Sequence, residues 1–271
     1  MWLSPGAAAA SARCREGRMD TTLKDKVAIV TGGGRGIGAA FCEGLAEAGA
    51  KVVVSDVLDG NPVAERIGER QHSAIYVRAD VTSKASVESL VADTVREFGT
   101  VDILVNNAGL FADLAVKPFL NIDEDEWDRV MKVNVRGTFQ CAKAVAPVMM
   151  EKKSGRIVNI ASGTAFKGTP NFLHYVASKG AVVSMTRSLA RELGPYNICV
   201  NAIAPGLTMS EAVVTNPDWT GKASAAGIAA RAIQREQVPA DLISTLVYFC
   251  SDASNFITGQ TISVDGGALM R

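Results

Sequence analysis

The stretch from Val27 to Gly38, VAIVTGGGRGIG, decides the fold of this chain. Its first residues form an apolar run rich in β-branched side chains, as is typical of a strand buried on both faces of a parallel sheet. A glycine-rich turn follows the run, and Ile37, Phe41, Leu45 and Ala48 then recur with helical spacing. The order strand, glycine turn, helix predicts the first βαβ unit of an α/β domain.

The glycines of this turn also favour a bound nucleotide. A backbone without side chains can approach a pyrophosphate closely, and the start of the following helix supplies N–H donors and a favourable dipole. The spacing over Thr31–Gly38 is TGxxxGxG, which differs from the more familiar GxGxxG fingerprint. The alternative is a merely tight turn, but such a turn needs fewer glycines, so we interpret the segment as a dinucleotide-binding turn.

Two residues bear on which dinucleotide is bound. The second strand-like run ends at Asp56, eighteen residues past Gly38. A carboxylate at this offset accepts hydrogen bonds from the adenosine ribose hydroxyls of NAD and repels the 2′-phosphate of NADP. Arg35 acts in the opposite sense, because a basic side chain in the turn can pair with that phosphate. The sequence favours NAD and leaves NADP as the alternative.

From Lys24 onward, short β-branched runs alternate with helix-like segments. The runs are Val27–Val30, Val52–Val54, Ala74–Val77, Ile103–Val105, Ile157–Ile160, Ile198–Ile203 and Thr261–Val264. We expect helices over Ser83–Phe98, after a cap at Asp123, and over Pro239–Ser251. The alternation predicts an α/β fold: a single Rossmann-like, doubly wound parallel sheet of about seven strands with helices on both faces.

One dinucleotide-binding oxidoreductase domain, residues 19–271, accounts for this pattern. Its one long irregular stretch, about residues 206–238, predicts a substrate loop or lid. Residues 1–18 are Ala-rich and then Arg-rich, without the basic and apolar regions of a secretion signal. We interpret them as a disordered extension before a second start at Met19, with an organelle transit peptide as the alternative.

Composition argues against several classes of function. The 28 basic and 28 acidic residues balance and are spread out, so nucleic-acid binding is not expected. No apolar run approaches the roughly 18 residues of a membrane span, and we expect a cytoplasmic protein without membrane contact. The 5 cysteines and 2 histidines show no metal-ligand spacing, so no metal site is expected.

A tyrosine and a lysine four residues apart form the candidate catalytic pair. Helical spacing puts Tyr175 and Lys179 on one face, and Ser162 lies thirteen residues before Tyr175. A phenol has a pKa near 10, and a nearby positive charge lowers it. Such a tyrosine can move a proton to or from an alcohol oxygen, which a serine hydroxyl can hold. Alone, the pair is more typical of a helix surface, so the rest of the chain has to support catalysis.

Together these motifs resemble those of the short-chain dehydrogenase/reductase family, compact single-domain type, over about residues 23–271. The matching segments are Thr31–Gly38, Asp80-Val81, Asn106–Gly109, Asn134, Ser162, Tyr175 with Lys179, Val200–Gly206 and Gly259–Gly267. They occur in the family's order and at its spacing. The resemblance implies an NAD-dependent oxidoreductase that interconverts a secondary alcohol and a ketone by hydride transfer, and a homotetramer.

The resemblance also implies the roles of individual residues. Tyr175 is the proton donor or acceptor, and Lys179 lowers its pKa and binds the nicotinamide ribose. Ser162 orients the substrate oxygen, and Asn134 anchors a water that links Lys179 to solvent. The implied cofactor-binding residues are Gly32, Arg35, Gly36, Ile37, Gly38, Asp56, Asp80, Val81, Asn107, Tyr175, Lys179 and Thr208.

The sequence says less about the substrate. Candidate pocket residues are Phe111, Thr164, Phe166, Phe172, Met209 and Trp219, and their apolar character suggests a hydrophobic or cyclic alcohol or ketone. The chain also resembles 3-oxoacyl-carrier-protein reductases, which commonly use NADPH and dock an acidic carrier on basic residues. Asp56 and the sequence Pro195-Tyr196-Asn197 argue against that alternative, whereas Lys153 remains as a docking charge. A non-catalytic NAD(H)-binding sensor or scaffold is the alternative of another class.

Overall fold

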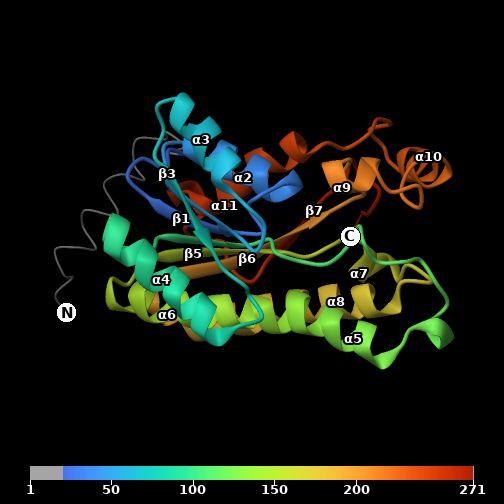
Figure 1. Ribbon diagram of the computed structural model, residues 1–271, viewed down its shortest axis with the longest axis horizontal. Helices are drawn as coiled ribbons and strands as arrows, with labels where there is room; N and C mark the ends of the chain where they lie inside the picture. The colour runs from blue at the N-terminus through green and yellow to red at the C-terminus, as the bar shows by residue number, and fades with distance from the viewer. Residues whose placement is uncertain (1–20, 271) are drawn as a thin grey trace.

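The computed structural model describes residues 21–270 as a seven-stranded parallel sheet with helices on both faces (Figure 1). The strands are β1 Val27–Thr31, β2 Lys51–Asp56, β3 Ala74–Arg78, β4 Ile103–Asn106, β5 Gly155–Ile160, β6 Ile198–Pro205 and β7 Thr261–Val264. Each predicted strand lies within an observed one, so the predicted fold class is confirmed. The predicted N-terminal extension, residues 1–18, lies outside the described residues.

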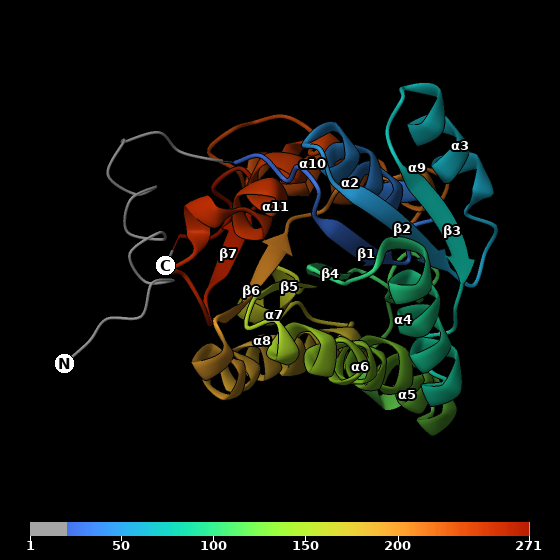
Figure 2. The ribbon, with the colours of Figure 1, turned by 90° about the vertical axis from the view of Figure 1, so that its left-hand side faces the viewer.

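The helices form two layers with the sheet between them (Figure 2). One layer contains α2 Gly36–Glu47, α3 Asn61–Glu69 and α11 Ile243–Cys250; the other contains α4 Lys84–Phe98, α5 Glu124–Met131, α6 Thr138–Glu151 and α8 Leu173–Leu193. Three further helices, α7 Thr164–Lys167, α9 Glu211–Val214 and α10 Lys222–Ala229, lie beyond the ends of β5 and β6. Single 3₁₀ turns are η2 Phe119–Asn121, η4 Gly194–Tyr196, η5 Pro239–Leu242 and η6 Asp252–Ser254.

Side-chain hydrogen bonds cap the first turns of α4 and α5 at the residues that the sequence predicted. The Ser83 side chain accepts a hydrogen bond from Ser86 N at the start of α4, and Asp123 accepts one from Glu126 N at the start of α5. The helix expected after Asp123 is interrupted by a π-helical segment, η3 Lys132–Gly137, before it continues as α6. Such wider turns are frequent at functional sites.

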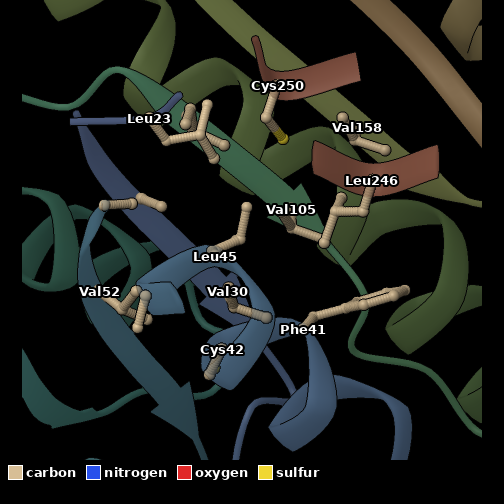
Figure 3. Packing of buried hydrophobic residues seen from close by; sticks show 14 of the residues in the cluster. Leu23, Val30, Phe41, Cys42, Leu45, Val52, Val105, Val158, Leu246 and Cys250 are labelled. Atoms are coloured by element: carbon tan, nitrogen blue, oxygen red, sulfur yellow. The ribbon is translucent and has the colours of Figure 1, made fainter. Parts of the chain in front are cut away.

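Alternation along the strands builds a separate core on each face of the sheet. Val30, Val52 and Val105 pack on the α2 and α11 side (Figure 3), whereas Ile29, Val53 and Leu104 pack on the α4 and α6 side. This is the period of two expected of strands that are buried on both faces. The free thiols at Cys42, Cys141, Cys199 and Cys250 are all buried, as expected of core residues.

The strand order places a crevice at the centre of the sheet. The order is β3-β2-β1-β4-β5-β6-β7, so the chain reverses its direction of winding between β1 and β4. Ligands of open α/β sheets bind beyond the carboxyl ends of the strands at such a reversal. Within residues 21–270, no helix combines the length and the apolar character that a bilayer crossing requires.

Candidate active site

A cavity of about 790 Å³ lies along the carboxyl ends of the central strands. All the predicted cofactor-binding residues line it: Gly32, Arg35, Gly36, Ile37, Gly38, Asp56, Asp80, Val81, Asn107, Tyr175, Lys179 and Thr208. Ser162 lines it as well, whereas Asn134 lies behind its wall. The sheet therefore brings residues from the whole length of the chain to one site.

The glycine turn has the backbone that its sequence suggested. Gly32 and Gly36 have φ of 64° and 57°, in the region that favours glycine. A Cβ on Gly38 would lie 1.9 Å from the Gly32 carbonyl oxygen, so any larger residue would displace the turn. The Asn107 side chain holds the turn itself, because Nδ2 donates to Thr31 O at 3.0 Å and to Gly32 O at 2.9 Å.

The end of β2 presents a fixed carboxylate to the same cavity. Asp56 is 9% exposed, and its two oxygens accept hydrogen bonds from Gly34 N at 2.9 Å and Leu58 N at 3.0 Å. Arg35 pairs with Asp113 at 3.8 Å, and both side chains are at least half exposed. A glycine cradle, the uncapped start of α2 and a held carboxylate fit the phosphates and ribose of a dinucleotide.

The candidate catalytic residues meet at the other end of the cavity. Tyr175 and Lys179 come from α8, and the lysine Nζ lies 5.7 Å from the centre of the tyrosine ring. Lys179 Nζ donates to Ile160 O at 2.7 Å, which ties it to the end of β5. Ser162 follows β5, and its Oγ accepts hydrogen bonds from the N–H and the hydroxyl of Thr164.

Burial controls the protonation of this pair. Desolvation raises the pKa of Tyr175 to about 12, and a hydrogen bond from Ser162 acts in the opposite direction. Desolvation also lowers the pKa of Lys179 to about 8. The tyrosine shift is opposite to the predicted lowering, because the pocket that buries Tyr175 disfavours the phenolate more strongly than its neighbours favour it. Without a cofactor, the phenol is therefore protonated at neutral pH.

Asn134 lies in the π-helical segment and is fully engaged by protein atoms. Its Oδ1 accepts from Leu110 N at 2.8 Å, and its Nδ2 donates to Ser178 Oγ at 3.0 Å. A Cβ on Gly109 would lie 3.2 Å from Asn134 Oδ1 and 3.5 Å from Lys179 Nζ. Gly109 therefore leaves room for both side chains beside the segment after β4. The predicted water at Asn134 stays a prediction.

Two residues of this arrangement were missed as site residues, although the sequence contained a signal for each. Ser178 donates to Tyr175 O at 2.7 Å and accepts from Asn134, and it directly precedes Lys179 in the Tyr-Val-Ala-Ser-Lys sequence. Gly109 ends the Asn106–Gly109 motif. Their roles follow from contacts between segments distant in sequence, which the motifs alone do not give.

Aromatic side chains surround Tyr175 at the substrate end. The rings of Phe111 and Trp219 stack with 4.6 Å between centroids, and Phe111 lies 5.1 Å from the Tyr175 ring. Phe111, Thr164 and Trp219 line the cavity as predicted. The other three predicted pocket residues do not line it: Phe166, Phe172 and Met209. Phe172 is instead fully buried against Tyr175, with ring centroids 4.9 Å apart.

The predicted substrate loop, about residues 206–238, covers this end of the site. It contains α9 and α10 rather than being irregular throughout. Its two ends are tied together where Thr208 pairs with Gln237 and where Arg231 donates to Leu207 O at 2.6 Å. Its tip is tied to the segment after β4, because Asn216 Nδ2 donates to Ala112 O at 2.5 Å. The loop therefore places Trp219 over the aromatic cluster.

Comparisons with known proteins agree with this fold. The model of a family described as enoyl-(acyl carrier protein) reductase matches residues 32–268. A 3-oxoacyl-acyl-carrier-protein reductase of Staphylococcus aureus is 35% identical, covering 90% of this chain and 98% of its own. A subunit of the hydroxy(phenyl)methylsuccinyl-CoA dehydrogenase of Thauera aromatica is 38% identical, covering 90% and 97%.

Among solved structures, a short-chain type dehydrogenase/reductase from Mycobacterium ulcerans superposes with a TM-score of 0.86. It is 28% identical and covers 91% of this chain and 90% of its own. The names of these proteins are those of reductases and dehydrogenases, and the solved structure shares the fold of this chain. The chain is therefore an oxidoreductase that belongs to the short-chain dehydrogenase/reductase family.

Proposed function

We propose that this protein interconverts a secondary alcohol and a ketone with NAD. The observation that carries the proposal is one cavity with two ends. A glycine turn and Asp56 line one end, and Ser162, Tyr175 and Lys179 line the other. A site of this shape holds a dinucleotide along its length and brings an alcohol oxygen within reach of Tyr175.

When bound, the nicotinamide ring would supply the acceptor or donor of the hydride. The residues of this chain would handle the oxygen and its proton. Ser162 holds the substrate oxygen by a hydrogen bond from its hydroxyl. Tyr175 takes the proton of the substrate hydroxyl on oxidation and returns it on reduction. Lys179 binds ribose hydroxyls and, when protonated, opposes the rise in the pKa of Tyr175 that burial causes. Asn134 fixes the π-helical segment beside Lys179.

NAD is favoured over NADP by the position of Asp56. The side chain is buried and fixed by two backbone donors, so it cannot swing away from a phosphate that enters beside it. Like charges placed together in a buried site cost several kcal/mol. Arg35 is half exposed and forms only a weak surface ion pair with Asp113 at 3.8 Å, so we take the fixed and buried Asp56 as the stronger determinant.

A flat or cyclic apolar substrate fits the aromatic end of the cavity. Phe111 and Trp219 stack on each other and both line the cavity beside Tyr175, and aromatic side chains pack well against flat groups. The relative from Thauera aromatica, whose name includes a phenyl-bearing hydroxymethyl group, supports this substrate class. We therefore propose a ring-bearing secondary alcohol or ketone.

Reduction of a 3-oxoacyl carrier thioester with NADPH is the second candidate, because the Staphylococcus relative has that name. The position of Lys153 gives it no support. This lysine precedes β5, whereas the cavity lies beyond the carboxyl end of that strand. A carrier that docked on Lys153 would sit at the wrong edge of the sheet. A non-catalytic NAD(H) sensor is a weaker candidate still, because it would not need Ser162, Tyr175 and Lys179 in one cavity wall.

We also propose a cytoplasmic homotetramer. Exposed apolar side chains lie on α6 and on or just before β7. Phe139 on α6 is 46% exposed, Ile262 on β7 is 39% exposed, and Phe256 just before β7 is 99% exposed. Apolar side chains this exposed are typical of surfaces that a second copy covers.

Initial rates with a panel of secondary alcohols, compared between NAD and NADP, test the proposal. The same preparation is assayed for NADPH-dependent reduction of a 3-oxoacyl thioester. We expect fastest turnover with NAD and ring-bearing alcohols. Faster thioester reduction with NADPH would replace the proposal by the carrier reductase. NADH binding without turnover of any substrate would support the sensor instead.

A further inference from the structure

Tyr175 lies in the first turn of α8, which lacks the usual means of holding a helix start. The helix begins at Leu173, its N-cap is Phe172, and no side chain caps it. There is no acidic residue in its first turn either. An uncapped first turn is prone to fraying. A proton donor in that position therefore needs support from elsewhere in the fold.

A three-residue polar network supplies that support beside the tyrosine. His174 is completely buried, and its Nε2 lies 2.9 Å from Glu126 Oε1 on α5. The second carboxylate oxygen of Glu126 forms an ion pair with Lys117, from the segment between β4 and α5. The backbone N–H of Lys117 donates to Asn171 O at 2.9 Å, just before α8. The network thus joins three segments around the start of α8.

The charges of the network fix how the histidine is held. Burial acts to raise the pKa of Glu126, but hydrogen bonds from Lys117 and His174 outweigh it and leave that pKa below its usual value. The carboxylate is therefore ionised and accepts a hydrogen bond from the N–H at His174 Nε2. The other ring nitrogen, Nδ1, is buried without a partner. One hydrogen bond, through Nε2, determines the orientation of the ring.

We infer that Glu126, paired with Lys117 and bonded to His174, is a positioning residue that holds the Tyr175 hydroxyl in its reacting place. The inference rests on the proposed function, because it takes from it that Tyr175 is the group that moves the proton. Glu126 does not line the cavity, so it acts through His174 and the first turn of α8. Misplacement of a reacting group by about 1 Å can cost about 100-fold in rate.

Substitutions of His174 test the route through Nε2. Gln can place its amide nitrogen near the position of Nε2, whereas Asn places it near Nδ1, which has no partner. We expect His174→Gln to keep kcat within about threefold of the parent, and His174→Asn and His174→Leu to lose about tenfold or more. All three should bind NADH, followed by its fluorescence, as the parent does. Equal kcat values for the Gln and Asn variants would overturn the inference.

Glu126→Gln is tested against a matched control in the full chain. Asp102 also pairs with a lysine, Lys152, with side chains 17% and 26% exposed against 12% and 25% for Glu126 and Lys117. Asp102 precedes β4, at the edge of the sheet away from the cavity. Asp102→Asn therefore breaks an ion pair of similar burial that does not touch the start of α8, and the Asn amide oxygen can still accept the hydrogen bond from Val27 N.

Hydrogen exchange and steady-state kinetics separate positioning from general stability. We expect Glu126→Gln, and not Asp102→Asn, to speed exchange at Val176, whose N–H donates to Phe172 O at 3.0 Å. We also expect it to lower kcat about tenfold with little change in KM. Equal effects of the two variants would overturn the inference. A parent that turns over no panel alcohol would overturn the proposed function alone, because the exchange comparison does not depend on turnover.

Discussion

At the scale of single residues, the sequence predicted which side chains meet but not the chemistry that burial gives them. Tyr175 and Lys179 share a cavity wall with Ser162, as their spacing suggested. The pKa of Tyr175 is nevertheless raised, because desolvation depends on the packing of Phe111 and Phe172 around it. No local pattern reports that packing.

Asp56 makes a residue-scale prediction about cofactor choice. Asp56→Ser removes the buried charge that opposes a 2′-phosphate, so the ratio of kcat/KM for NADP over that for NAD should rise by about 100-fold. The matched control is Asp113→Asn, which removes an exposed carboxylate from the same cavity. A ratio that stays at the parental value in Asp56→Ser would rule out Asp56 as the selector.

Lys179 makes a prediction about pH and stability. Its folded pKa is about 8 and its ordinary value is 10.5, so between them the unfolded chain binds more protons than the folded chain. The contribution of Lys179 to the free energy of unfolding therefore rises as pH increases through this window. In urea unfolding, the parent should gain stability relative to Lys179→Met between about pH 8 and about pH 10.5. If the difference in the free energy of unfolding between the parent and Lys179→Met stayed constant over this range, the pKa of Lys179 would not be lowered by burial.

At the scale of elements, strands and capped helices were predictable because their signals are local. Runs such as Val52–Val54 are β-branched and apolar, and Ser83 and Asp123 cap the helices that follow them. The π-helical segment Lys132–Gly137 was not predicted, because its glycine, Gly137, stands only at its end and nothing in KVNVRG distinguishes a wider helical turn from an ordinary one. The link between Glu126 and His174 spans 48 residues, beyond the reach of any local pattern.

The glycine turn gives the element-scale prediction. In Gly38→Ala the new Cβ would lie 1.9 Å from Gly32 O, so the turn must shift and NADH binding should weaken by about tenfold or more. Gly68→Ala in α3 is the control, because its Cβ meets nothing within 4 Å and alanine favours helix by about 1 kcal/mol. The control should bind NADH normally and melt slightly higher. NADH binding by Gly38→Ala as tight as that of the control would show that the turn does not cradle the cofactor.

At the scale of the whole molecule, the parallel sheet brings the residues of the site together. Asp56, Ser162 and Tyr175 are far apart in the chain, and the parallel order of the strands brings them to one edge. The sequence predicted this convergence because strand ends of a doubly wound sheet share that edge. It could not predict how the loop after β6 folds, because the contact of Asn216 with Ala112 joins residues 104 positions apart.

Transfer of deuterium from the carbinol carbon of the best panel alcohol to NAD, followed in one turnover, tests the central claim most directly. The parent should move the label into the nicotinamide. Tyr175→Phe should still bind NADH but transfer the label about 1,000-fold more slowly, as expected when a general acid–base is removed. Label transfer by Tyr175→Phe at the parental rate would contradict the role of Tyr175 as the group that moves the proton.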